Sequence, residues 1–311
     1  MPVTRKNLPR LPIALTIAGS DSSGGAGIQA DLKTFQALGV FGMSAITAVT
    51  VQNTQKVYAI QEMTPEIVHD QITCLFEDTE IQAVKIGMVS SVALIETIAA
   101  ALGSVRRPPV VLDPVMVSKS GYALLQPDAR QALIQRLFPL ARVVTPNVPE
   151  AELLVGAEIK DAEQMRAAAR RIVQMGVPKV VVKGGHLGGD HSVDILYDGA
   201  EFTELSDARI ATRHTHGTGC TFSSAIAAWL ARGCPFTEAV RRAKQYVTGA
   251  IGHALAIGKG HGPTHHFYEL YARAGVKAGC QGLAPARGLS KSKPNRRGFS
   301  PITAAEKIEK T

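Results

Sequence analysis

Four consecutive small residues, Gly217-Thr218-Gly219-Cys220, have the types and spacing of an anion-binding site. They open a predicted helix, and glycines at a helix start let a ligand reach backbone N–H groups at the positive end of the helix dipole. A cysteine at this position can have a lowered pKa, so we expect Cys220 to be a thiolate beside the anion. A glycine-rich connector with a small buried cysteine is the alternative. The apolar spacing predicts one buried helix face, formed by Phe222, Ala225, Ile226, Trp229 and Leu230.

A second glycine-rich turn lies near the N-terminus, in residues 22–27, after an apolar run at 12–18 and before a predicted helix. Gly25, Gly27 and Ala30 fit the spacing of a dinucleotide-binding fingerprint in its proper context. The next predicted strand, however, ends in Gln52, where that fingerprint expects a carboxylate for the ribose. A P-loop is excluded because Gly260 follows Lys259 in place of serine or threonine.

Short apolar runs alternate with amphipathic helices along the chain, which predicts a mainly parallel sheet with helices on both faces. Polar or glycine residues follow the carboxyl ends of these runs. In open α/β sheets the ligand binds beyond those ends. We therefore expect one cleft to collect six residues from six segments, namely Gly19, Gln52, Met88, Asp113, Asn147 and Lys183.

Several of these side chains suggest individual roles. Asn147 and Glu150 begin a predicted helix, where they form an ordinary cap or hold Mg²⁺ through water. Lys183 at a strand end suits a phosphate. Asp31 is either a first-turn acid that stabilises its helix or a hydrogen-bond acceptor for substrate, and we favour the second. The histidines at 214, 216, 265 and 266 match no metal-site spacing, so we interpret them as solvated.

The net charge of +8 is concentrated at the chain ends. Residues 1–10 carry three basic residues and no acid, and residues 276–311 carry eight basic and two acidic residues, which leaves a net charge of −1 between them. We expect a basic arm at 1–10, a single domain at 11–275 and a basic, mostly disordered tail at 276–311. The composition predicts no nucleic-acid or membrane partner. Four unpaired cysteines and no signal peptide favour the cytoplasm.

The order of the motifs resembles one known family, the hydroxymethylpyrimidine/phosphomethylpyrimidine kinases of thiamine biosynthesis, which belong to the ribokinase-like superfamily. The resemblance covers roughly residues 11–270, and the combination is specific although each motif alone is weak. The motifs are A-G-S-D-S-S-G-G-A-G-I-Q-A-D at 18–31, V-Q-N-T at 51–54, K-I-G-M at 85–88, L-D-P-V-M at 112–116, T-P-N-V-P-E-A at 145–151, K-G-G-H at 183–186, T-H-G-T-G-C-T at 215–221 and G-K-G-H-G-P-T-H-H-F at 258–267.

This resemblance implies a ribokinase-like three-layer α/β sandwich that uses ATP and Mg²⁺. It implies phosphorylation of 4-amino-5-hydroxymethyl-2-methylpyrimidine and then of its monophosphate to the diphosphate. Cys220 would be the catalytic base within an anion hole formed by Gly217 to Cys220, including Gly219. By similarity, Gln52 would bind the aminopyrimidine edge. The other implied residues are Gly19, Asp31, Met88 and Val115 lining the pocket, Lys183, Thr212, Asn147 and Glu150 near the nucleotide, and Asp113 with Glu150 near the metal.

Three alternatives remain open at this point. A pyridoxal or pyridoxine kinase would bind a similar flat ring that bears a hydroxymethyl group. A nicotinamide-dependent oxidoreductase would use the first glycine loop, and a sensor would keep the fold without catalysis. For the kinase we expect a homodimer that acts on a small molecule.

Overall fold

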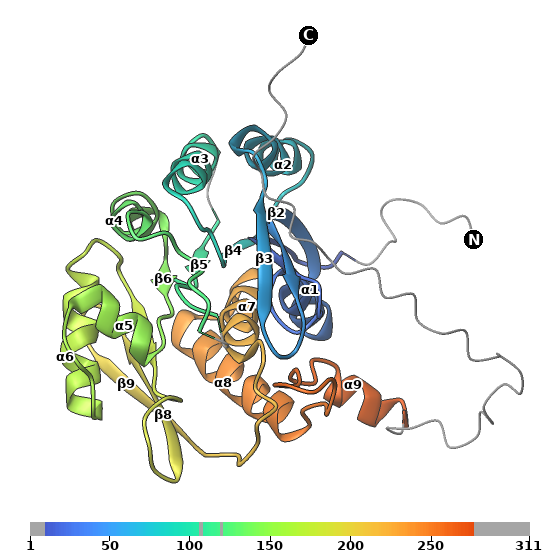
Figure 1. Ribbon diagram of the computed structural model, residues 1–311, viewed down its shortest axis with the longest axis vertical. Coiled ribbons are helices and arrows are strands. Elements are labelled where there is room, and N and C mark those ends of the chain that lie inside the picture. The colour runs from blue at the N-terminus through green and yellow to red at the C-terminus, as the bar shows by residue number, and fades with distance from the viewer. Residues whose placement is uncertain (1–9, 106–107, 119–120, 277–311) are drawn as a thin grey trace, which may run out of the picture.

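A nine-stranded sheet forms the middle of the computed structural model, which describes residues 10–105, 108–118 and 121–276 (Figure 1). The strand order is β3-β2-β1-β4-β5-β6-β7-β8-β9. The six central strands run parallel: β1 (Ile13–Asp21), β2 (Phe41–Gln52), β4 (Ala83–Ile86), β5 (Val110–Leu112), β6 (Val143–Val144) and β7 (Val180–Lys183). Antiparallel strands form both edges: β3 (Val57–Glu62) on one side, and β8 (His191–Tyr197) and β9 (Phe202–Ala208) on the other.

Helices cover both faces of the sheet, as the sequence predicts (Figure 1). One face packs against α1 (Gly27–Ala37), α7 (Thr218–Ala231) and α8 (Phe236–Gly252), in a core that includes Phe35, Phe222 and Val240. The other face carries α2 (Pro65–Asp78), α3 (Val92–Gly103), α4 (Ala129–Ala132) with the π and 3-10 turns that continue it to Leu140, α5 (Val148–Val155) and α6 (Ala162–Val173). A short last helix, α9 (Tyr268–Arg273), follows. The predicted three-layer α/β sandwich is confirmed.

Helix α7 is buried differently from what its sequence pattern predicts, because Trp229 and Leu230 of the predicted face are only half-buried, whereas the first part of the helix is buried on every side. Every residue from Thr221 to Ala228 is buried, and not only one apolar stripe. The reason is its place in the helical layer, because α7 lies between α1 and α8 and also contacts strands β1, β4 and β5 (Figure 1). Small residues on its remaining faces, such as Ser223, Ser224 and Ala227, permit this close approach.

The strand order changes direction at β1: β2 pairs with one edge of this strand, and β4 pairs with its other edge. Such a reversal opens a crevice beyond the carboxyl ends of the strands. Glycine turns at the end of β1 and before α7 border this crevice. Within the described ranges, no helix is both long and apolar enough to cross a bilayer. The predicted arm and tail fall almost entirely outside these ranges, as does Cys280.

Candidate active site

A cavity of about 680 Å³ lies beyond the carboxyl ends of the parallel strands. All six residues that the sequence places at strand ends line this cavity, so their predicted convergence is confirmed. Val115, Glu150 and the segment from Gly217 to Cys220 line it as well. Its lining also extends over the antiparallel edge, through residues of β8, the end of β9 and α8, with Asp194, Arg209, Lys244 and Ile251 among them.

The two glycine-rich turns pack directly against each other. Gly217 has φ 78°, and a β-carbon on it would lie 1.8 Å from the Gly25 carbonyl oxygen. The backbone N–H of Gly27 in the first turn acts to lower the pKa of Cys220 in the second. No side chain caps α7 and its first turn holds no acidic residue, although Gly217, Thr218, Gly219 and Cys220 all line the cavity. The two turns together thus have the local features that an anion site requires.

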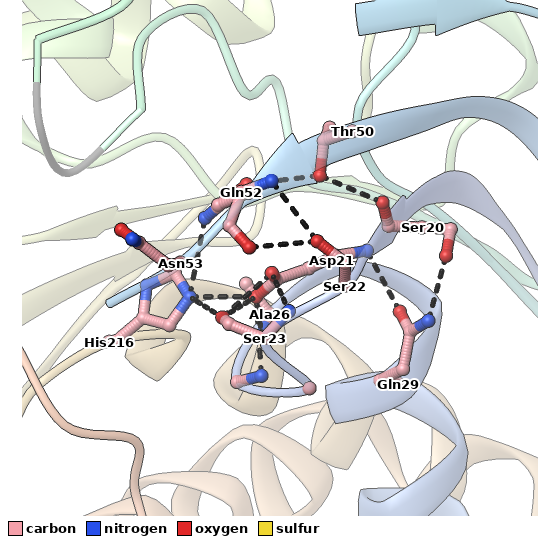
Figure 2. A network of polar contacts seen from close by, with 12 residues as sticks. Ser20, Asp21, Ser22, Ser23, Ala26, Gln29, Thr50, Gln52, Asn53 and His216 are labelled. Carbon is pink, nitrogen blue, oxygen red and sulfur yellow. Dashed lines mark hydrogen bonds and ion pairs between the residues drawn. The ribbon is translucent and has the colours of Figure 1, made fainter. Parts of the chain in front are cut away.

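A buried Asp21–His216 pair ties these turns together (Figure 2). Asp21 Oδ2 lies 2.7 Å from His216 Nε2 and accepts from the N–H of Ala26 at 2.8 Å, and its Oδ1 accepts from Ser23. Burial acts to raise the pKa of Asp21, but the bonds from His216 and Ser23 outweigh it and lower the pKa from 3.8 to about 2. His216 is 7% exposed and His266 is 4% exposed, which corrects the interpretation of both as solvated histidines.

Gln52 lies beside this pair and next to an apolar patch. Its Oε1 accepts from Thr50 Oγ1 at 3.2 Å, and its Nε2 lies 3.5 Å from His216 Nε2 (Figure 2). Ala48, Met88 and Leu124 form a small apolar cluster, against which Val115 packs. Gly19 keeps this space open, since a β-carbon there would lie 3.2 Å from Met88 Sδ. An apolar patch beside an oriented amide suits a flat heteroaromatic ring.

Asp113, Lys183 and Glu150 form a charged cluster beside the start of α7, where a β-carbon on Gly219 would lie 3.3 Å from Lys183 Nζ. Lys183 Nζ donates to Asp113 Oδ1 at 2.8 Å, and Thr145 Oγ1 donates to the same oxygen at 3.2 Å. Asn147 and Glu150 form a capping box at the start of α5, so the predicted cap is confirmed. Burial raises the pKa of Glu150 to about 7, with a further raising effect from the charge of Asp113 and an opposing effect from Lys183.

These residues fit the metal that the sequence predicts. The negative charge of Asp113 opposes the ionisation of Glu150 at the same cavity wall, and a divalent cation would remove that cost. Among the described residues there is no group of three or more acidic, histidine or cysteine side chains arranged around one metal position. A donor set of this size suits Mg²⁺, which keeps several waters and takes few protein carboxylates together with substrate phosphates.

The structure corrects the expectation that Asp31 lines the pocket. Asp31 is 0% exposed and lies behind the cavity wall. A carboxylate so buried needs internal partners, and Lys85, Thr16 and Ser224 supply them at 2.6–2.9 Å. Thr212 also lies outside the lining, and its hydroxyl accepts from the N–H of His214. Arg209, Ile210 and Thr215 of the same connection line the cavity instead.

The expectation of a lowered pKa at Cys220 is also wrong. Burial raises the pKa of its thiol from 9.0 to about 11. The positive charge of Lys85 and the Gly27 N–H act in the lowering direction, while Asp31 and Asp113 add to the raising effect. The helix start therefore does not by itself make this cysteine a thiolate, because the desolvation of the charged form has the larger effect.

The sequence did not predict the roles of Asp21 and Lys85 at this site, nor the pairing of His216 with Asp21. Asp21 ends β1 and so carried the strand-end signal that identified the other residues. Lys85 is a lysine inside an apolar strand, which itself indicates a buried ion pair. The pairing of His216 with Asp21 bridges residues 195 positions apart, and no local pattern in the sequence encodes it.

A mainly parallel sheet covered by helices on both faces, with paired glycine turns and a cluster of carboxylates and lysine lining one cavity, is the architecture of a ribokinase-like small-molecule phosphotransferase. A sequence model of the phosphomethylpyrimidine kinase family matches residues 21–265. The chain belongs to this family.

Two curated relatives are each 54% identical to the chain. One is the hydroxymethylpyrimidine/phosphomethylpyrimidine kinase of Rhizobium meliloti, matched over 83% of this chain and 98% of the relative. The other is a thiamine biosynthesis bifunctional protein of Geobacter sulfurreducens, matched over 81% of this chain and 51% of the relative, so the chain spans about half of that protein. Among solved structures, the ADP complex of Bacillus subtilis pyridoxal kinase is 41% identical with a TM-score of 0.79, covering 84% of this chain and all of the neighbour.

Proposed function

We propose that this protein phosphorylates 4-amino-5-hydroxymethyl-2-methylpyrimidine and then its monophosphate, with ATP as donor, in thiamine biosynthesis. The observation that carries the proposal is the lining of one cavity, which combines glycine turns at a helix start, an apolar patch and a charged cluster. The names of the relatives support the same substrate class. The ADP complex of the structural neighbour supports a nucleotide in the same fold.

In the proposed reaction the pyrimidine ring lies on the patch of Met88 and Val115, and Gln52 binds its amino edge. This pose directs the hydroxymethyl group toward Gly217–Cys220, where the backbone N–H groups stabilise the charge of the transferring phosphoryl group. Lys183 binds the phosphates of the nucleotide. A phosphoryl transfer with a loose transition state depends mainly on such positioning and charge neutralisation.

Cys220 accepts the hydroxyl proton in this mechanism. The thiol can do so only after it has lost its own proton, and burial opposes that loss by raising its pKa to about 11. Positive charge near the sulfur must therefore offset part of the effect of burial.

Asp113 and Glu150 would hold Mg²⁺ on the nucleotide side of the cavity. When bound, the cation neutralises charge on the phosphates of ATP. The chain's own contribution there is the buried Lys183–Asp113 pair, which fixes the direction of one carboxylate.

The proposal is tested by ADP release with the free and the monophosphorylated pyrimidine measured side by side. We expect Mg²⁺-dependent turnover of both, with no activity on NAD-linked substrates. Turnover of neither pyrimidine would overturn the proposal.

A pyridoxal kinase is the second candidate, because the structural neighbour with that name shares 41% identity. The same cavity could hold the pyridine ring of pyridoxal against Met88. We expect kcat/KM for the pyrimidine to exceed that for pyridoxal. The reverse order would favour the second candidate.

A further inference from the structure

A fully buried ion pair contacts helix α7, whose first turn carries the proposed anion site. Lys85 from β4 and Asp31 from α1 are both 0% exposed, and their charged atoms are 2.9 Å apart. The desolvation of two buried charges costs free energy that offsets much of their mutual attraction, so such a pair adds little net stability. Neither residue lines the cavity, so the proposed substrate contacts do not account for them.

Asp31 connects this pair to the helix that carries Cys220. Its Oδ1 accepts from Ser224 Oγ of α7 at 2.6 Å, and its Oδ2 accepts from Thr16 Oγ1 of β1 at 2.6 Å. Ser224 lies four residues after Cys220, one turn along the same helix. Asp31 therefore fixes α7 to the sheet at the level of the thiol.

Lys85 is built into the sheet with little room to move. A β-carbon on Gly87 would lie 2.4 Å from Lys85 Nζ. The glycine of the K-I-G-M motif therefore allows the backbone at position 87 to pass close to the ammonium group. The positive charge of Lys85 acts on Cys220 more strongly than the negative charge of Asp31 does. The other charged groups that act at the thiol are Asp113, after β5, and Lys183, at the end of β7.

We propose that Lys85 and Asp31 are positioning residues for phosphoryl transfer: Asp31 holds α7 through Ser224, and Lys85 supplies positive charge behind the Cys220 sulfur. The inference deepens the proposed function, because it rests on the role of Cys220 as the proton acceptor. It assigns a use to a buried pair that touches neither the proposed substrate nor the nucleotide.

The test measures alkylation of Cys220 by iodoacetamide in the free enzyme between pH 7 and 9.5, quantified on the peptide that contains Cys220. Only the thiolate reacts. We expect Lys85→Met to slow this alkylation about tenfold at each pH, the effect of raising the thiol pKa by one unit. Turnover should fall with it, while KM for the pyrimidine stays within about twofold.

Two further variants separate charge from folding. Lys85→Met with Asp31→Asn removes both charges, so it should recover thermal stability lost in the single variant yet keep alkylation slower than in the wild type. Ser224→Ala keeps both charges and removes only the bond to α7, so it should lower kcat without slowing alkylation. If the double variant and Lys85→Met both alkylate at the wild-type rate, the proposed charge effect is wrong.

The alkylation measurement needs neither substrate nor turnover. If Cys220 were not the base, Cys220→Ala would keep its turnover while Lys85→Met still slowed alkylation of the thiol. If the charge effect were absent, Cys220→Ala would lose its turnover while Lys85→Met alkylated at the wild-type rate. The two failures are therefore distinguishable.

Discussion

At the scale of single residues, the most demanding position is Cys220, a thiol with a raised pKa at a helix start that carries no side-chain cap. Its neighbours must both orient it and offset the cost of its ionisation. Gln52 has the simpler proposed role of binding the ring edge. Its amide accepts a hydrogen bond from Thr50 and lies beside His216.

Replacing Cys220 with alanine should lower kcat by at least about a hundredfold, because general-base catalysis contributes about 10²–10⁴. KM for the pyrimidine should change little, since the pocket walls are intact. Steady-state ADP release gives both values. Cys234→Ala is the control, because Cys234 is a half-buried free cysteine that does not line the cavity. Wild-type turnover in Cys220→Ala would refute the base assignment.

Replacing Gln52 with alanine should raise KM for the pyrimidine about tenfold, the effect of losing one or two hydrogen bonds to the ring edge. The value of kcat should fall much less. The neighbouring Gln55→Ala serves as control, because Gln55 is exposed and does not line the cavity. An unchanged KM in Gln52→Ala would contradict the assigned contact.

At the scale of elements, the contact between the two glycine turns determines the shape of the anion site. Gly217→Ala should lower kcat severely, because a β-carbon would lie 1.8 Å from the Gly25 oxygen and force the turns apart. Gly39→Ala is a matched control, with φ 73° and no atom near the new β-carbon. We expect it to cost only the left-handed backbone strain of about 1 kcal/mol. Unfolding and ADP-release measurements on both variants check this, and equal activities would show that the contact is unimportant.

The Asp21–His216 pair joins the same turns, and its effect on stability depends on pH. The pKa of Asp21 is lowered on folding, so its contribution is full above about pH 4 and is lost as the pH falls through about 2. Asp21→Asn should therefore lower the free energy of unfolding by about 2 kcal/mol at pH 7, with a difference that shrinks toward pH 3. Urea titrations at several pH values measure it. A pH-independent difference would argue against the pair, and exposed Asp70→Asn provides the baseline.

At the scale of the whole molecule, we propose that a single domain carries the activity and that the basic tail does not. The family match ends at residue 265, and the last described helix ends at Arg273. Deleting residues 277–311 should leave kcat/KM within about twofold of the full chain, because the family match ends before the deleted segment begins. A loss above about tenfold would assign the tail a role in catalysis. The homodimer remains a prediction, which light scattering of both forms would test.

The sequence by itself determined the parallel sheet, its two helical layers and the strand-end residues that line the cavity. Period-two and helical spacing encode the elements, and the carboxyl ends of parallel strands meet at one edge, so Gln52, Asp113 and Lys183 converge by rule. The glycines at positions 217 and 219 likewise predict an anion site from local sequence alone.

Only the tertiary structure decided the state of individual charged groups. Asp31 has the helical position of a pocket residue, but Lys85, 54 positions away, pairs with it behind the cavity wall. Cys220 has the helix start of a thiolate, but burial raises its pKa. Desolvation and pairing depend on which residues surround a group in space, and the partners here come from strands and helices far apart in the chain. Local spacing therefore predicts which helix or strand end carries each of these groups. The packing around each group determines its charge and its partners.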